Sequence, residues 1–429
     1  MNTQTGTPDF CSAAAAEARD ALVERQLAAL AEHEPVVRAF VCYDVDAARQ
    51  RLAQRNSGPL AGALVGVKDI ICTADFPTRY GASDPGDVAP RRDAWCVSET
   101  RGRGGTVLGK TVCTQFAYPI PGPTTNPHDA GRTPGGSSSG SAAAVAAGFV
   151  SFALGTQTAA STIRPASYCG VTGYKPTHGL VHTDGVQAIS TTLDHVGIFA
   201  RSPRDAWYFV SALVLRTAEV AAPRPPRRLL VLRLPPEIPH DDGYRERMAE
   251  LTERLRREGV GVTALDLPFA LKDFTGLQRE LCYWEAARIL RMPKPVRPVP
   301  QLEALLAPYR DMDIARYLSA RVRRQAYQAE FAALAAGCDA VLTPAATGAA
   351  PGVGDTGDAV MSRFWTALQV PAMTVPMWSS AEGLPLGLQL LGGLGTDRAL
   401  AETAQWFFER RELASRCSPR TQRSIADRR

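Results

Sequence analysis

The stretch that most constrains the fold runs from Pro134 to Gly148 and reads PGGSSSGSAAAVAAG. Serine favours the start of a helix because its hydroxyl accepts hydrogen bonds from the free N–H groups of the first turn. Alanine has the highest helix propensity, so we predict a glycine-rich loop that leads into an alanine helix. The N–H groups and the dipole at that helix end favour negative charge. The loop therefore suits an anion, or an oxyanion formed during a reaction.

Apolar segments before and after this loop predict a sheet. We expect strands at Leu64–Ile71, Thr106–Lys110, Phe149–Leu154, Arg228–Leu232, Asp339–Thr343, Ala372–Pro376 and Leu386–Leu391. Apolar residues spaced three and four apart predict helices between them, at Ala94–Arg101, Ser202–Leu215 and Thr396–Glu409. Strands that alternate with helices favour an α/β sandwich with a mixed sheet.

The pattern predicts one domain over residues 1–429. Its parts are two N-terminal helices within 12–57 separated by Pro35, a core formed by 60–220 and 339–409, a mainly helical capping segment at 225–338, and a flexible tail at 411–429. The proline- and arginine-rich connector AAPRPPRR, at residues 221–228, marks the change from the core to the capping segment.

Composition narrows the class of protein. The chain has 45% hydrophobic and 21% charged residues and a net charge of +5, which are typical of a soluble globular protein. Its nine cysteines form no close pair and no zinc-ligand spacing. Neither a secretory signal nor an apolar run long enough for a membrane span is present. We expect a cytoplasmic protein with no metal, no cofactor, no nucleic-acid partner and no membrane contact.

Two features carry chemistry. Lys68 interrupts the apolar segment LVGVKDII, and burial can lower the pKa of a lysine by several units, which leaves a neutral amine able to act as a base. Serine clusters lie at residues 137–139 and within GTQTAASTIRPAS, at 155–167. A serine hydroxyl needs such a base before it can attack, and no histidine lies in either cluster.

One competing motif involves Ser138. The segment GSSSG matches the G-x-S-x-G nucleophile elbow, with Ser138 as the nucleophile. That elbow requires a strand directly before its first glycine. Pro127 and Pro134 interrupt the preceding segment, so a core strand there is disfavoured and we expect a chance match.

Together these stretches resemble the amidase signature family. The likeness lies in VGVKD (65–69), GKT (109–111), GPTTNPHD (122–129), PGGSSSGSAAAVAAG (134–148) and GTQTAASTIRPASYCGVTGYKPT (155–177), followed by TGD (356–358), VPAMTVP (370–376) and GLPLGLQL (383–390). The resemblance implies a central mixed, twisted sheet covered by helices on both faces, with a mainly helical capping insertion.

The resemblance also implies a Ser–cis-Ser–Lys triad. Lys68 matches the family lysine, Ser137 matches the serine that follows a cis peptide bond, and Ser161 matches the acylated nucleophile. The implied cycle passes a proton from Ser161 through Ser137 to neutral Lys68. The backbone N–H groups of Thr158, Ala159, Ala160 and Ser161 would bind the oxyanion.

Other residues near these motifs are given supporting roles. We expect Asp69, Gln157 and Arg164 to support the site through ion pairs or hydrogen bonds. Ser138 and Ser139 are expected to cap the helix and to form hydrogen bonds within the loop, with Ser138 also helping to fix the loop, and Cys169 is expected in the core. Four aromatic residues have two open interpretations, lining the acyl pocket or packing in the core: Tyr283, Trp284, Phe364 and Trp365.

The chain departs from the family pattern beside the nucleophile. The family usually has glycine at one or both positions before the nucleophile, whereas this chain has Ala159 and Ala160. An alanine forced into a left-handed conformation there would cost ~1–2 kcal/mol. The family's arginine is displaced, with Ile163 in its place and Arg164 next. Gln115 and Gln157 stand where acidic residues are common.

Three functions fit this sequence. The first is an amidase that hydrolyses a small-molecule carboxamide. The second is an amide-forming acyltransferase that uses the same triad, and the third is a partner-dependent glutaminase of the amidotransferase A-subunit type. The resemblance also suggests a homodimer, and it places specificity in residues 228–336, where the likeness fades.

Overall fold

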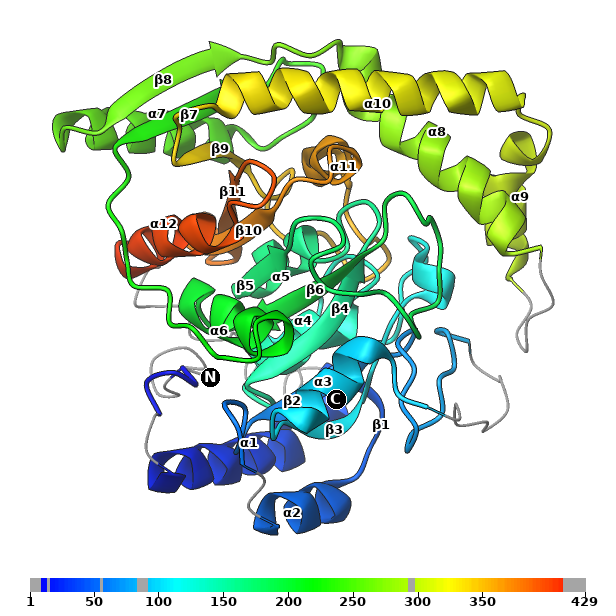
Figure 1. Cartoon of the computed structure of the whole chain (residues 1–429), viewed down its shortest axis with the longest axis vertical. Helices are drawn as coiled ribbons and strands as arrows, with labels where there is room; N and C mark the ends of the chain where they lie inside the picture. The colour runs from blue at the N-terminus through cyan, green and yellow to red at the C-terminus, as the bar shows by residue number, and fades with distance from the viewer. Residues whose placement is uncertain (1–8, 14–15, 55–56, 83–91, 292–297, 412–429) are drawn as a thin grey trace, which may run out of the picture.

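A single mixed sheet of eleven strands forms the centre of the molecule, and helices cover both of its faces (Figure 1). The computed structural model describes residues 9–13, 16–54, 57–82, 92–291 and 298–411. The strand order across the sheet is β1-β3-β2-β4-β6-β5-β10-β11-β9-β7-β8. This arrangement confirms the predicted α/β fold class.

The strands are mostly short and buried. Their bounds are β1 (Phe40–Tyr43), β2 (Leu64–Lys68), β3 (Thr106–Thr111), β4 (Phe152–Gln157), β5 (Thr172–Lys175), β6 (His195–Ala200), β7 (Arg228–Arg233), β8 (Gly261–Asp266), β9 (Ala340–Pro344), β10 (Ala372–Ser379) and β11 (Pro385–Leu391).

The helices follow the strands around both faces. Their bounds are α1 (Ala16–Val37), α2 (Val45–Ala53), α3 (Trp95–Gly102), α4 (Ser139–Ala146), α5 (Ile163–Cys169), α6 (Pro203–Val214), α7 (Asp242–Arg257), α8 (Leu271–Ile289), α9 (Pro300–Arg310), α10 (Ile314–Ala335), α11 (Val360–Ala367) and α12 (Asp397–Glu409), with a short 3₁₀ turn at Gln115–Ala117.

Strand β2, the third strand from one edge of the sheet, separates two hydrophobic layers. Side chains of a strand alternate between its two faces, and Val65 and Val67 pack in the same cluster as residues of α3, α6 and α12. Leu64 packs with residues of α1, α4 and α5 on the other face. Lys68 follows Leu64 at an even spacing, so it leaves the end of β2 on the side of α4.

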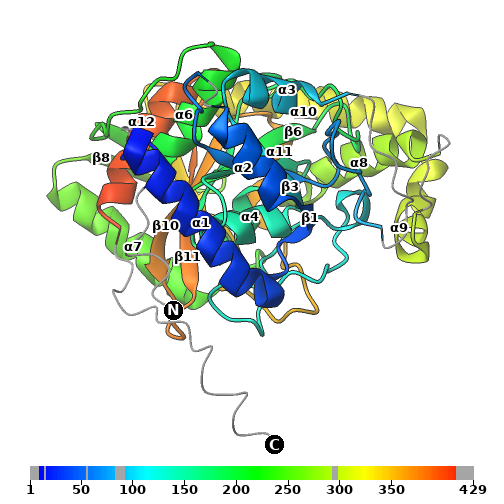
Figure 2. The ribbon, with the colours of Figure 1, turned by 90° about the horizontal axis from the view of Figure 1, so that it is seen from below.

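The N-terminal segment differs from its prediction. Helix α1 continues through Pro35 to Val37 instead of breaking there. The proline cannot donate a backbone hydrogen bond to the preceding turn, but it lies in the last turn of the helix and does not end it. The chain turns at Arg38, which has a φ of 52°, and then adds β1 antiparallel to β3 at the sheet edge. Figure 2 shows α1 and α2 lying across this end of the molecule.

The segment predicted as a helical cap also extends the sheet. It contains α7, α8, α9 and α10, but β7 pairs in parallel with both β8 and β9. The strand β7 was predicted and β8 was not. The buried pattern of β7 is nearly continuous, whereas the residues of β8 are half exposed, so β8 lacks the apolar signal of a core strand.

Other boundaries also differ. Strand β4 begins at Phe152 and reaches Gln157, three residues later at each end than predicted, because α4 ends in a turn at Gly148 with a φ of 75°. Strand β6 and helix α5 were not predicted. Of the tail predicted at 411–429, residues 412–429 lie outside the described residues.

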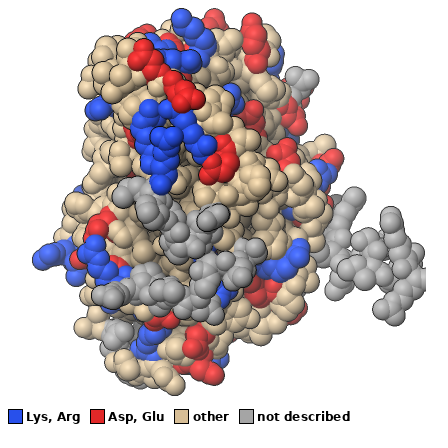
Figure 3. Space-filling model, turned by 90° about the vertical axis from the view of Figure 1, so that its right-hand side faces the viewer, with Lys and Arg blue, Asp and Glu red and all other residues tan. Residues whose placement is uncertain are grey.

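The surface carries both signs of charge. On the face that Figure 3 shows, a group of basic side chains in the upper half lies beside acidic ones. In the capping segment, for example, Arg316 and Arg323 both pair with Glu280.

Among the described residues, every helix is too short or too polar to cross a bilayer.

Candidate active site

Lys68 lies buried at the end of β2 between two hydroxyl groups. Its Nζ donates to Ser137 Oγ at 2.7 Å and to Thr156 Oγ1 at 2.7 Å. Within the described part of the chain, Lys68 forms no ion pair. Burial lowers its pKa to about 7, although the charges of Cys113 and Asp194 act in the opposite direction. Near neutral pH, much of Lys68 is therefore an uncharged amine.

Two glycines bring Ser137 to this lysine. Gly135 and Gly136 have φ values of 77° and 64°, and a Cβ on Gly136 would lie 2.9 Å from Cδ of Pro165. Only glycine allows both this backbone conformation and this close approach. The N–H of Ser137 then donates to Ser161 Oγ at 3.4 Å, so one residue contacts both the lysine and the second serine.

The expected cis peptide bond before Ser137 is absent. No peptide bond within the described residues is cis. A non-proline cis bond costs ~3–4 kcal/mol, and here the two left-handed glycines turn the chain while its peptide bonds stay trans. That part of the predicted triad is wrong for this structure.

The capping roles predicted for Ser138 and Ser139 are also wrong, and the Oγ of Ser139 has no hydrogen-bond partner among the described residues. Ser138 is the N-cap residue of α4, but its side chain makes no capping hydrogen bond. Its Oγ instead donates to the carbonyl of Thr156 at 3.2 Å and accepts from the N–H of Thr156 at 3.3 Å. Ser138 thus ties the glycine loop to β4, the fixing role that was also expected of it.

Ser161 lies in a turn between β4 and α5. The Oε1 of Gln157 accepts from the N–H groups of Thr162 at 2.8 Å and Ile163 at 3.0 Å. The Nε2 of Gln157 donates to Thr366 Oγ1 at 2.9 Å. The amide of Gln157 both accepts and donates, so it can form all three hydrogen bonds. A carboxylate could accept from the two N–H groups but has no hydrogen to donate to Thr366.

Side chains from other elements donate hydrogen bonds to the carbonyl groups of this turn. Gln278 of α8 donates to the carbonyl of Thr158 at 2.8 Å, and Thr366 of α11 donates to that of Ala159 at 2.7 Å. The hydroxyl of Thr158 donates to Asp194 at 2.6 Å. Burial raises the pKa of Asp194 to about 6.

The N–H groups of the turn remain available. Those of Ala159, Ala160 and Ser161 donate no hydrogen bond to the described part of the chain. Neither Ala159 nor Ala160 has a positive φ, so alanine causes no left-handed strain at these positions. The turn can therefore present backbone donors to a bound oxygen without the glycines that are usual in the family.

Ser137 and Ser161 open into a cavity of about 80 Å³. Its wall includes Tyr118, Arg164, Gln278, Cys282, Tyr283 and Arg363. Of the four aromatic residues with two interpretations, only Tyr283 lines this cavity. Phe364 and Trp365 are buried in the core, and Trp284 stacks on Tyr317 with ring centroids 3.8 Å apart.

The remaining predicted residues lie around the site. Asp69 forms a buried ion pair with Lys110 at 3.6 Å and accepts from the N–H of Arg79. Arg164 is buried and donates to the carbonyl of Gly357, and burial lowers its pKa. Cys169 is fully buried in the core. No cluster suited to a metal ion occurs among the residues that the structure describes.

Four contacts of the site were missed at the sequence level: Thr156, Asp194, Gln278 and Thr366. Thr156 had a usable signal, because it lies two residues past Leu154, which pairs with Val67 of the neighbouring parallel strand. Asp194, Gln278 and Thr366 come from distant segments, and nothing in the local sequence marks them.

Comparisons with known proteins identify the family of this chain. The amidase family profile matches residues 21–270 and 284–401. The A subunit of the chloroplastic/mitochondrial glutamyl-tRNA(Gln) amidotransferase from Zea mays is 40% identical over 212 residues, which are 45% of this chain and 38% of that protein. The chain therefore aligns with well under half of this relative.

Solved structures match over most of the chain. The crystal structure of an amidase has a TM-score of 0.82 and 29% identity, covering 92% of this chain and 96% of that one. The peptide amidase of Stenotrophomonas maltophilia has a TM-score of 0.77 and 27% identity, covering 92% and 93%. Since the family profile spans well over half of its residues, the chain belongs to the amidase signature family.

Proposed function

We propose that this chain hydrolyses the C–N bond of a small carboxamide through an acyl-enzyme on Ser161. The observation that carries the proposal is the position of Ser137 beside both other groups: its Oγ accepts from Lys68 Nζ, and its backbone N–H donates to Ser161 Oγ, with all three residues buried. Burial holds the pKa of Lys68 at about 7, close to the pH at which a general base works best.

In the proposed cycle, Lys68 accepts the proton of Ser137 while Ser137 accepts the proton of Ser161. The Ser161 oxygen attacks the amide carbonyl, and the N–H groups of residues 158–161 bind the resulting oxyanion. Loss of one such donor typically costs ~10²–10³ in rate. The relay then returns a proton to the leaving nitrogen, and water releases the acid by the reverse route.

The cavity favours a short substrate with an anionic group. The cavity is small, about 80 Å³, which favours a short acyl group. Arg164 and Arg363 both line it, and the Nε of each lacks a hydrogen-bond partner among the described residues. Guanidinium groups bind carboxylates strongly, so we propose a short carboxamide that also carries a carboxylate.

A covalent probe tests the nucleophile. Incubation with a fluorophosphonate, followed by peptide mass spectrometry, should place a single adduct on Ser161. The Ser161→Ala variant should give none. An adduct on Ser138 in the wild-type protein would replace this mechanism with the nucleophile elbow.

A second candidate is a glutaminase that works only with a partner. It is favoured by the relative from Zea mays, which is one subunit of an amidotransferase. Light scattering on the purified chain, with ammonia release from glutamine measured alone and in the presence of candidate partner subunits, separates the two functions. Hydrolysis of glutamine only in a complex would favour the second candidate.

A further inference from the structure

A second cavity lies beside β7 and β8, at the edge of the sheet away from Ser161. It has a volume of about 410 Å³ and lies between α7 and the strands β7 and β8. Pockets for small ligands are typically ~300–1,000 Å³. This groove shares no lining residue with the cavity of Ser161, so substrate binding there does not explain it.

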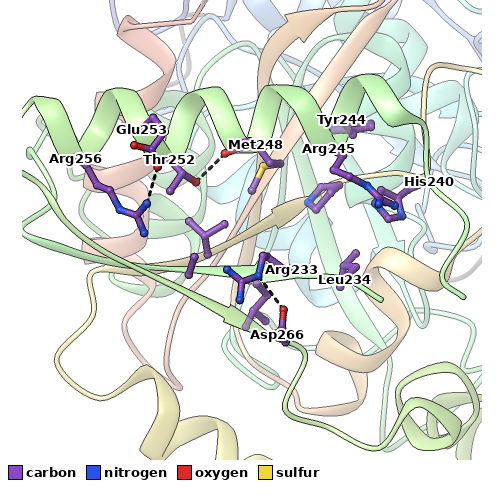
Figure 4. Close-up of a pocket in the computed structure, with 15 residues that line it drawn as sticks. Arg233, Leu234, His240, Tyr244, Arg245, Met248, Thr252, Glu253, Arg256 and Asp266 are labelled. Atoms are coloured by element: carbon purple, nitrogen blue, oxygen red, sulfur yellow. Dashed lines mark hydrogen bonds and ion pairs between the residues drawn. The ribbon is translucent and has the colours of Figure 1, made fainter. Parts of the chain in front are cut away.

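The base of the groove is apolar. Met248 and Tyr244 of α7 pack in one hydrophobic cluster with Val231 of β7, and each of these side chains is less than a tenth exposed. Figure 4 shows that Met248 and Thr252 lie on the side of the helix that faces the strands. An alkyl or aryl body placed on this surface would be removed from water, which is favourable at ~25 cal/mol per Å².

The rim has one cation without a counter-charge. Arg233 is paired with Asp266 at 2.8 Å, and Arg256 is paired with Glu253 at 2.6 Å. Arg245 forms no ion pair with any described residue, and its Nη2 lies 3.5 Å from Nε2 of His240. The uncompensated charge is therefore confined to one end of the groove, where Figure 4 places Arg245 beside His240.

We propose that this groove binds an amphipathic monoanion, a medium-chain carboxylate, with its carboxylate on Arg245 and its alkyl chain over Met248 and Val231. The apolar base matches the chain, and the single uncompensated guanidinium matches one negative charge. A dianion would place its second charge near Asp266 or Glu253, and an uncharged chain would leave Arg245 without an anionic partner.

Calorimetric titration with octanoate tests the proposal. The full chain is first treated with a fluorophosphonate so that Ser161 cannot contribute, and the untreated chain is titrated in parallel. We expect one site in both, with 1-octanol binding at least about tenfold more weakly, as the loss of a charge-assisted hydrogen bond implies. Absence of binding at millimolar octanoate, or binding only to the untreated chain, would overturn the proposal.

Three variants locate the site. Arg245→Gln should weaken octanoate binding about tenfold, and Ala249→Phe, which fills the groove from the exposed side of α7, should abolish it. Arg247→Gln is the matched control, because Arg247 lies on the same helix and pairs with Glu250 outside the groove. Equal loss in Arg245→Gln and Arg247→Gln, with unchanged melting temperatures, would show that general surface charge is responsible and the proposal is wrong.

Discussion

The Nζ of Lys68 lies 2.7 Å from Ser137 Oγ, in a part of the sheet where the lysine side chain has no exposed surface. Desolvation disfavours the ammonium form, and this sets the pKa of Lys68 at about 7. The rate of an amidase that uses this amine as its base should therefore depend on pH in the neutral range.

We expect kcat/KM for a carboxamide to rise with pH, to reach half of its maximum near pH 7, and to level off above. Below that pH, Lys68 carries the proton that it must accept. The variant Lys68→Arg stays charged at every accessible pH, so it should lose activity by ~10²–10⁴. A profile that is flat between pH 6 and 8 would contradict the role of Lys68.

The same pKa predicts a stability effect. Between pH 7 and the ordinary value of 10.5, the unfolded chain binds a proton at Lys68 that the folded chain does not. The contribution of Lys68 to the free energy of unfolding therefore rises with pH across this window. Denaturant unfolding at pH 7, 8 and 9 should show a slope reduced by up to ~1.4 kcal/mol per pH unit in Lys68→Met. The slope does not vanish, because Lys175 also has a pKa of about 7 through burial.

Ser137 and Ser138 are adjacent serines that we expect to differ sharply. Ser137→Ala removes the hydroxyl between Lys68 and Ser161, so kcat should fall ~10²–10⁴ with little change in stability. Ser138→Ala removes two hydrogen bonds to the backbone of Thr156. It should lower the free energy of unfolding by ~1–3 kcal/mol and leave kcat within about tenfold of wild type. Steady-state kinetics and denaturant unfolding of both variants distinguish the roles, and a larger loss of kcat in Ser138→Ala would reverse them.

Lys68 and Ser137 could be predicted from the sequence because each departs from the pattern of the residues around it. Lys68 is a charge in an apolar strand, and Ser137 follows two glycines before an alanine helix. The partners that hold these groups were not predictable, since Gln278 and Asp194 obey the rules of their own segments and meet the site only through tertiary packing. Strand β1 was missed for a similar reason: its four residues follow a long helix and gain their strand character from pairing with β3.

Gln157 provides a test of positioning. Gln157→Ala leaves the N–H groups of Thr162 and Ile163 without their acceptor, and each buried unsatisfied group costs ~1–3 kcal/mol. We expect a clear loss of stability together with a lower kcat and little change in KM, because the turn that carries Ser161 loses its support. Gln157→Glu keeps the acceptor and should recover part of kcat. If KM alone rose in Gln157→Ala, the residue would contact substrate instead of holding the turn.

Arg363 provides the sharpest test of the substrate class. It lines the cavity of Ser161 and contacts Gln278 Oε1 at 3.4 Å, so its guanidinium can turn to a bound carboxylate without breaking a strong interaction. In Arg363→Gln, kcat/KM for a short carboxamide that carries a carboxylate should fall ~10–100-fold, the range of a charge-assisted hydrogen bond. For the neutral amide of the same length, kcat/KM should change less than about threefold, because that substrate has no charge to lose. The ratio of the two values cancels any general damage to the fold. An equal fall for both substrates would mean that Arg363 supports the cavity wall, and the carboxylate-bearing substrate class would then be wrong even if Ser161 remains the nucleophile.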